Sequence, residues 1–207
     1  LKKINFLNQK KTIVFFTGGI TKRNHYYFGN ERPDIKNSFW KLNSKITRIF
    51  SKYQEKYNFI IKDYAVGQKK LWEKMLHDTN SQKIKYISDK YSVADIAKYS
   101  DLIILPWFST TFFESLYSDA DIFLLEKESI DEFKTKKFMD EVNFFDNESL
   151  FLNQIEKYLQ NDLFIKKNKT FVRDFFLNFS GYNKRDYYLE DALKRIENSQ
   201  ILIKNNN

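Results

Sequence analysis

The clearest structural signal in this sequence is Leu102-Ile103-Ile104-Leu105, a continuously apolar run that ends at Pro106. A strand that is covered on both faces has this composition, because neither face meets water. Similar short runs recur along the chain, and stretches with helical periodicity separate them. Strands that alternate with helices at this spacing predict a parallel sheet wound by right-handed crossovers.

Further strands are predicted from short apolar or β-branched runs on either side of this segment. They cover residues 12–16, 59–61, 84–87 and 122–125. Apolar residues spaced along helical faces predict helices over 38–57, 68–76, 92–97 and 109–117. Ser92 is the expected N-cap of the third of these helices, with Asp95 as its capping-box partner. The predicted fold class is therefore α/β, with a Rossmann-like parallel sheet flanked by helices.

After Glu126 the pattern predicts helices only, over residues 149–159, 163–179 and 186–201. We therefore expect a Rossmann-like domain over 1–148. An α-helical extension over 149–207 would pack on it and end in a polar tail.

The composition excludes several classes of protein. Of the 207 residues, 42% are hydrophobic and 18% aromatic, which is ample for a packed core and excludes intrinsic disorder. No apolar run approaches the roughly 20 residues of a membrane span, and the N-terminal residues lack an apolar signal region, so we expect a cytoplasmic protein. The absence of cysteine and of clustered acidic residues and histidines predicts no metal site and no bound cofactor.

The chain is basic, with 35 Lys and Arg against 27 Asp and Glu and a net charge of +8. Such a surplus is typical of nucleic-acid-binding proteins. Lysine is, however, spread along the whole chain together with abundant Asn, Ile, Tyr and Phe, as an AT-rich coding bias would produce. No known nucleic-acid-binding motif is present, so a nucleic-acid partner is not expected.

In an open parallel sheet, ligands bind beyond the carboxyl ends of the strands. Thr17-Gly18-Gly19 follow the first strand, and glycines there permit a close approach of the backbone to a ligand. His25 follows nearby and titrates close to neutral pH, which makes it the candidate catalytic residue. Lys62 follows the second strand and can reach the same crevice. The alternatives are an ordinary glycine turn and a polar strand end.

The most specific signal is Ser109-Thr110-Thr111, three hydroxyl residues at the start of a predicted helix directly after a strand. Free backbone N–H groups and side-chain hydroxyls suit a nucleotide phosphate. Glu114 shares a helix face with Thr110 and Thr111, and its carboxylate can accept hydrogen bonds from two ribose hydroxyls. The alternative is a capping box between Thr111 and Glu114, in which Glu114 only stabilises the start of the helix.

Residues 84–126 resemble the donor-nucleotide half of GT-B glycosyltransferases and of the related CDP-glycerol glycerophosphotransferases. The resemblance rests on Ser92-Val93-Ala94-Asp95-Ile96, Ser100-Asp101-Leu102-Ile103-Ile104, and Ser109-Thr110-Thr111 followed by Glu114-Ser115-Leu116. Residues 138–148 and 172–176 are similar to the later part of surface-carbohydrate transferases. The similarity extends over residues 11–188.

This resemblance implies a transferase that moves a sugar or a polyol phosphate from a nucleotide-activated donor to an acceptor hydroxyl, in surface glycan biosynthesis. The implied donor-binding residues are Thr17, Gly18, Gly19, Lys62, Ser109, Thr110, Thr111 and Glu114. The hydroxyl residues would hold the donor phosphates and Glu114 the ribose. The implied partners are a nucleotide-sugar or CDP-polyol donor and a glycan or lipid-linked acceptor.

The resemblance also implies an N-terminal acceptor domain that this chain lacks, so that the chain would be an incomplete enzyme. Its positive charge suits an anionic donor and peripheral contact with the inner face of a membrane. The sequence departs from the family where Lys62-Asp63-Tyr64-Ala65 stands in place of Lys-x-His-Pro, and where Ser118-Asp119-Ala120-Asp121 replaces a Gly-x-Pro turn. These departures leave open a second interpretation, a non-catalytic nucleotide-binding or interaction module derived from a degenerate transferase.

Overall fold

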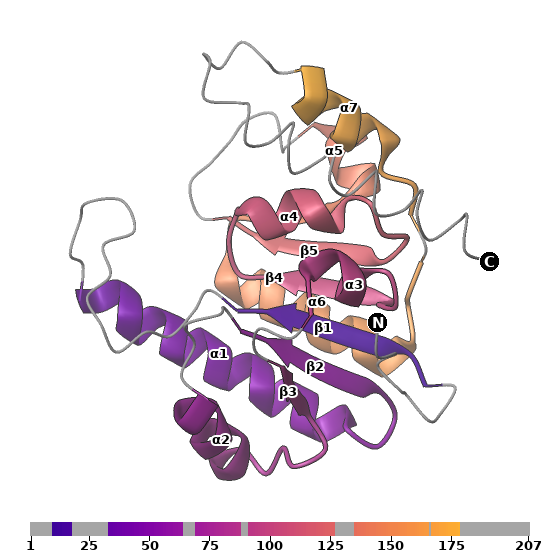
Figure 1. Ribbon diagram of the computed structural model, residues 1–207. Coiled ribbons are helices and arrows are strands. Elements are labelled where there is room, and N and C mark those ends of the chain that lie inside the picture. The colour runs from indigo at the N-terminus through magenta and orange to yellow at the C-terminus, as the bar shows by residue number, and fades with distance from the viewer. Residues whose placement is uncertain are drawn as a thin grey trace.

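The computed structural model describes residues 10–17, 33–63, 69–87, 91–126, 135–165 and 167–178, with only the backbone at 33–39 and 177–178. In these residues one sheet of six parallel strands lies at the centre (Figure 1). The strands are β1 (Thr12–Phe16), β2 (Asn58–Lys62), β3 (Lys85–Ile87), β4 (Leu102–Leu105), β5 (Asp121–Leu125) and β6 (Asn143–Phe145). Their order across the sheet is β3-β2-β1-β4-β5-β6. The predicted α/β class with a Rossmann-like sheet is confirmed.

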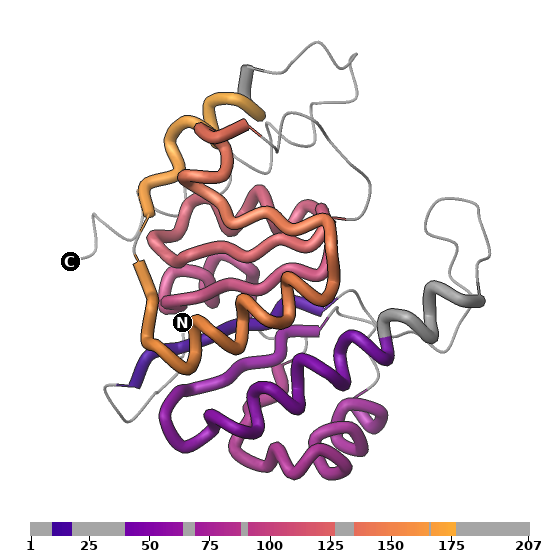
Figure 2. The backbone as a smooth tube through the Cα atoms, turned by 180° about the vertical axis from the view of Figure 1, so that it is seen from behind, coloured from indigo at the N-terminus to yellow at the C-terminus, as the bar shows by residue number. Residues whose placement is uncertain are grey.

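Helices cover both faces of the sheet. One face carries α1 (Pro33–Tyr53), α2 (Lys69–Asp78) and α6 (Glu148–Asn161). The other face carries α3 (Val93–Ala97), α4 (Thr110–Ser115), α5 (Lys136–Glu141) and α7 (Thr170–Asn178). Figure 2, seen from behind, shows α6 and α1 crossing the first of these faces side by side.

The two-sided cover follows from the alternation of side chains along a strand. Every residue of β1 is buried. Ile13 and Phe15 pack against α1 and α2, whereas Val14 and Phe16 pack toward α3 and α4. Burial on both faces explains why the strand sequences are continuously apolar rather than alternating.

Local signals define several helix ends. The predicted capping box of α3 is confirmed: the Ser92 hydroxyl accepts from the Asp95 amide, and the Asp95 carboxylate accepts from the Ser92 amide. Asn147 caps α6 by accepting from the amides of Ser149 and Leu150. Asp162 ends α6 in the left-handed conformation, with φ of 57°.

The structure corrects two expectations for the C-terminal part. The prediction of helices only after Glu126 is wrong, because β6 pairs in parallel with β5. The predicted helix over 163–179 is too long, since 163–165 and 167–169 are not helical and α7 begins at Thr170. The predicted helix over 186–201 lies outside the described residues. The division into units at residue 148 stays a prediction.

Candidate functional site

The strand order reverses between β1 and β4. From β1 the chain proceeds outward through β2 and β3, then returns to β4 on the other side of β1 and continues to β5 and β6. In open parallel sheets, ligands bind at the carboxyl ends of the strands at this kind of reversal. We call this side of the sheet the carboxyl edge: it is formed by the residues that follow the strands, Thr17, Asp63, Pro106 and Glu126 among them. Of the predicted site residues that the structure describes, Thr17 and Lys62 lie at strand ends on this edge, and Ser109, Thr110, Thr111 and Glu114 lie on the loop and helix that follow β4.

Lys62 and Glu114 are brought together here from two different elements. Lys62 ends β2 and, by strand alternation, lies on the same face as Ile60, which packs in the cluster that includes α4. Glu114 lies on α4 and is half-buried. Burial raises the pKa of the Glu114 carboxyl, and the positive charge of Lys62 opposes that rise. The Lys62 ammonium is therefore within electrostatic range of the Glu114 carboxylate.

The start of α4 decides between the two interpretations of Glu114. Ser109 is the N-cap of α4, so Thr111 already lies inside the helix and cannot form a capping box with Glu114. No hydrogen bond to the Glu114 carboxylate is found among the described residues. The interpretation of Glu114 as a helix cap is therefore wrong, and its carboxylate is open to a ligand.

The three predicted hydroxyl residues stand at the beginning of the same helix. The Ser109 side chain makes no capping hydrogen bond, so its hydroxyl does not stabilise the helix end. Thr110 is exposed and Thr111 is half-buried. Ser109 and Thr110 therefore present hydroxyl groups at the carboxyl edge, on the element that also carries Glu114.

A buried carboxylate that the sequence prediction missed organises the β1, β2 and β3 ends. Asp63 is 1% exposed, and its carboxylate accepts hydrogen bonds from three side chains of the described residues. The donors are the Thr17 hydroxyl at 2.6 Å, the Trp72 indole Nε1 at 3.0 Å and the Tyr86 hydroxyl at 3.2 Å. Thr17, predicted as a ligand contact, thus directs its hydroxyl at Asp63. A polar residue after a buried strand was the only sequence signal for Asp63, since its donors come from separate elements.

Glu126 is a second carboxylate that the prediction missed. It directly follows β5, and its Oε2 accepts a hydrogen bond from the Phe108 amide at 3.1 Å. This contact fixes the loop between β4 and α4. The Phe108 amide is consequently not open to a phosphate.

Gly18, Gly19 and His25 lie outside the described residues, so their predicted roles stay predictions. Within the described part of the chain, no group of three or more His, Asp or Glu side chains has an arrangement that could hold a metal ion. The same part of the chain contains no helix with the length and apolar composition of a membrane span.

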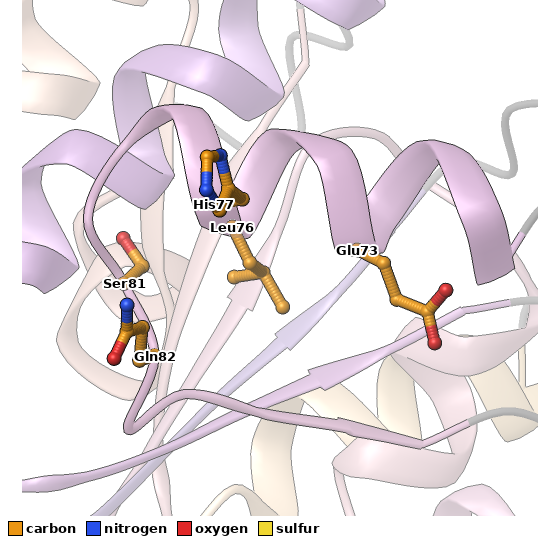
Figure 3. Close-up of a pocket in the computed structure, with 5 residues that line it drawn as sticks. All are labelled: Glu73, Leu76, His77, Ser81 and Gln82. Atoms are coloured by element: carbon orange, nitrogen blue, oxygen red, sulfur yellow. The ribbon is translucent and has the colours of Figure 1, made fainter.

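A shallow hollow of about 260 Å³ lies along α2 and the turn that follows it (Figure 3). Its lining residues are Glu73, Leu76, His77, Ser81 and Gln82. The turn leads into the beginning of β3, so the hollow lies at the opposite end of that strand from the candidate site. The His77 side chain is 83% exposed and pairs with Asp78, whereas the buried Ser81 hydroxyl bonds to Thr79. No described hydrogen bond joins His77 to Ser81, and this hollow lacks an activated nucleophile.

Lysines on the first helical face form ion pairs rather than an open basic patch. Lys45 pairs with Glu148 at 2.8 Å and Lys52 with Glu156 at 2.6 Å, which joins α1 to α6. Exposed pairs of this kind contribute at most about 1 kcal/mol each. These ion pairs favour the interpretation that the surplus lysines lie on solvated surface rather than in a nucleic-acid-binding patch.

No protein-family model and no curated protein sequence matches this chain. Solved structures share its fold. Over 84% of this chain and 87% of the other, it superposes with a TM-score of 0.50 and 11% identity on the C-terminal domain of LpcC, a glycosyl transferase group 1 family protein from Francisella tularensis. For WaaG, a glycosyltransferase involved in lipopolysaccharide biosynthesis, the TM-score is 0.50 at 8% identity, over 82% of this chain and 43% of WaaG. For ALG13 it is 0.50 at 13% identity, over 82% of this chain and 96% of ALG13.

Identities this low show a shared fold. The chain shares this fold with the glycosyltransferases LpcC and WaaG and with ALG13, so the predicted likeness to glycosyltransferase domains is confirmed for the fold, and donor binding stays a prediction. The chain spans less than half the length of WaaG. The resemblance to CDP-glycerol glycerophosphotransferases stays a prediction.

Proposed function

We propose that this chain is the donor-binding half of a GT-B-type transferase and binds a nucleotide-activated sugar or polyol at its carboxyl edge. The observation that supports the proposal is that Lys62, at the end of β2, and Glu114, on α4, lie on one face of the sheet beside the reversal in strand order, in a fold shared with glycosyltransferase domains. The charge of Lys62 also acts on the Glu114 carboxyl. A cation on the same face as a carboxylate without a described hydrogen bond matches a donor whose phosphates are anionic and whose ribose hydroxyls are hydrogen-bond donors.

Each residue then has a distinct role. Lys62 neutralises donor phosphate charge, and the hydroxyls of Ser109, Thr110 and Thr111 donate hydrogen bonds to phosphate oxygens. Glu114 accepts hydrogen bonds from the ribose hydroxyls. Because these groups are held before the ligand arrives, their contribution to the rate is positioning of the donor and stabilisation of the leaving phosphate. Gly18 and Gly19 would border the cleft toward an acceptor-binding domain.

In sugar transfer, the acceptor hydroxyl oxygen forms a bond to the anomeric carbon of the donor. The bond from that carbon to the diphosphate oxygen breaks, and its electron pair leaves with the nucleoside diphosphate. The acceptor proton passes to a base, for which His25 or a residue of the acceptor-binding domain is proposed. Lys62 stabilises the charge that develops on the leaving diphosphate. The acceptor is proposed to be a glycan or a lipid-linked glycan.

Calorimetric titration with CMP, CDP, UDP and GDP tests the donor site. One of these nucleotides is expected to bind at micromolar concentration. Lys62→Met should weaken its binding by about tenfold to a hundredfold, because one charge-assisted contact is lost. Glu114→Ala or Thr110→Ala should weaken it by about tenfold.

Matched controls exist on the opposite face of the sheet. Lys45→Met and Glu148→Gln make comparable changes in charge on α1 and α6, and both should leave the affinity unchanged. Failure of all four nucleotides to bind the folded chain would refute the donor site. Transfer activity after addition of an acceptor-binding domain would distinguish an enzyme from a non-catalytic nucleotide-binding module.

A further inference from the structure

The buried Asp63 carboxylate accepts hydrogen bonds from several elements of the fold, although it lies beside the candidate ligand site rather than in it. A buried carboxylate is costly to desolvate, and an apolar residue of similar size would fill the space below β2 without that cost. Asp63 is instead 1% exposed and bonded to Thr17, Trp72 and Tyr86, which come from the end of β1, from α2 and from β3. These hydrogen bonds therefore hold the end of β2 to the end of β1, to α2 and to β3.

The backbone around Asp63 is also held on both sides. The Thr17 amide donates to the Lys62 carbonyl oxygen at 3.0 Å, and the Asp63 amide donates to the Ile87 carbonyl oxygen at 3.1 Å. The Lys62 ammonium donates to the Asp63 carbonyl oxygen at 3.1 Å. The peptide that joins Lys62 to Asp63 is therefore fixed by β1 and β3, and the Lys62 ammonium bonds to the carbonyl oxygen of Asp63 in the next peptide.

Strand alternation sends these two neighbouring side chains to opposite faces. Asp63 lies on the face of Ile61 and reaches Trp72 on α2, whereas Lys62 lies on the face of Ile60 and approaches α4. The hydrogen bonds of Asp63 on one face of the sheet thus restrict the direction of the Lys62 side chain on the other face. The positive charge of Lys62 lowers the pKa of Glu114, so we expect a displacement of Lys62 to reach Glu114 through that charge.

We propose that Asp63 is a positioning residue: its three side-chain hydrogen bonds hold the Lys62 ammonium beside Glu114, where the pair receives the phosphate and ribose of a nucleoside diphosphate. The identity of the ligand rests on the proposed function, but the coupling between Asp63, Lys62 and Glu114 does not. Asp63 touches no ligand and acts only through Lys62. Its carboxylate is needed because a single group must accept hydrogen bonds from three donors.

The test is the titration of the Glu114 carboxyl, followed by carboxyl-carbon NMR and assigned with Glu114→Gln. Asp63→Asn keeps one acceptor oxygen instead of two, so either the Thr17 hydroxyl or the Trp72 and Tyr86 donors lose their acceptor, and the change should displace Lys62. Because Lys62 lowers the pKa of Glu114, Asp63→Asn is expected to shift that pKa upward, as Lys62→Met does. In the Lys62→Met background, Asp63→Asn should cause no further shift.

Tyr86→Phe provides a milder variant in case Asp63→Asn does not fold. It removes one donor and keeps the ring that packs on Trp72, and should give a smaller upward shift. The matched control is Tyr158→Phe, which removes a hydroxyl donor from Asp121 at the opposite edge and should leave the Glu114 titration unchanged. An unchanged Glu114 pKa in folded Asp63→Asn and in Tyr86→Phe would overturn the proposal.

Ligand binding separates this proposal from the proposed function. Asp63→Asn should weaken binding of the preferred nucleoside diphosphate by about tenfold and leave binding of the corresponding nucleoside unchanged, since only the phosphates contact Lys62. If no nucleotide binds the wild-type chain while the Glu114 titration still shifts as expected, the donor site fails and the positioning role stands. Equal weakening for nucleoside and diphosphate would contradict positioning through Lys62.

Discussion

Two buried carboxylates lie at opposite edges of the same sheet, and their neighbours differ. Asp63 stands at the carboxyl edge and accepts a hydrogen bond from the Tyr86 hydroxyl. Asp121 begins β5, is fully buried, and accepts hydrogen bonds from the Tyr158 hydroxyl at 2.9 Å and the Asn143 side-chain amide at 2.7 Å. We call the side where the strands begin the amino edge. The chemistry of the two carboxylates is similar, but the cations beside them are placed differently.

At the amino edge the cations are enclosed. Lys169 is 2% exposed, and its ammonium donates to the Ser118 carbonyl oxygen at 2.8 Å and the Lys167 carbonyl oxygen at 3.0 Å. The Lys167 ammonium lies 3.7 Å from the Asp121 carboxylate. At the carboxyl edge, by contrast, Lys62 is only half-buried and Glu114 has no described hydrogen bond. We therefore expect the amino edge to contribute more to stability, and Glu114 to be the carboxylate that a ligand can reach.

The largest effect is expected from Asp121→Ala. This change removes the carboxylate that lies 3.7 Å from the Lys167 ammonium and accepts hydrogen bonds from Tyr158 and Asn143, and it should lower the free energy of unfolding by about 3–5 kcal/mol. Urea denaturation would measure the loss, and the nucleotide affinity of the folded fraction should not change. A loss below about 1 kcal/mol would show that the amino edge is not the stabilising side.

The next effect concerns pH. Burial lowers the pKa of Lys169 from 10.5 to about 8, against the opposing influence of Asp121, Asp119 and Glu141, while Lys167 adds to the lowering. Above pH 8 the folded state releases a proton that the unfolded state holds up to about 10.5, so this lysine makes stability rise with pH across that window.

Lys169→Met should abolish that contribution. Urea denaturation of both proteins at about pH 7.5 and about pH 9.5 gives the comparison. The wild type is expected to gain stability relative to the variant at the higher pH. An equal pH dependence in the two proteins would contradict the enclosure of Lys169.

The smallest effect is expected at the carboxyl edge. Burial raises the pKa of Glu114, so this carboxyl makes the folded protein less stable as pH rises through its titration. Glu114→Gln lacks that loss and should increase the free energy of unfolding near neutral pH by less than about 1 kcal/mol, although it weakens nucleotide binding. A marked loss of stability on this substitution would make Glu114 a structural residue.

Much of the sheet could be predicted because its strands are buried on both faces. Leu102-Ile103-Ile104-Leu105 matches β4 residue for residue, and 12–16 matches β1. β6 escaped prediction because its three residues, Asn143-Phe144-Phe145, lie at the sheet edge and are too short to show a period. The non-helical stretch before Thr170 escaped because the apolar residues of 163–165 fit helical spacing, while the left-handed turn at Asp162 has no glycine to mark it.

The candidate site could be predicted only where a residue stood next to a strand end. Lys62 was named because it ends a strand, and Glu114 because it shares a helix face with the hydroxyl residues that follow β4; their roles stay predictions. Asp63 was not predicted, because its role depends on hydrogen bonds from Trp72 on α2 and Tyr86 on β3. Hydrogen-bond donors that come from separate helices and strands lie far apart in the sequence, so they form no pattern that can be recognised there.

The enclosed lysine at the amino edge also bears on the order of folding. Lys169 lies between α6, on one face of the sheet, and α7, on the other, and its ammonium is held by the turn that precedes β5. That anchorage does not exist until β5 has joined the sheet, so we expect α7 to dock late. Until then Phe112 and Phe138, which share a buried cluster with Val172 of α7, remain uncovered. A chain that is still being synthesised therefore exposes an aromatic surface on α4 and α5, the region where chaperone binding and misassembly would begin.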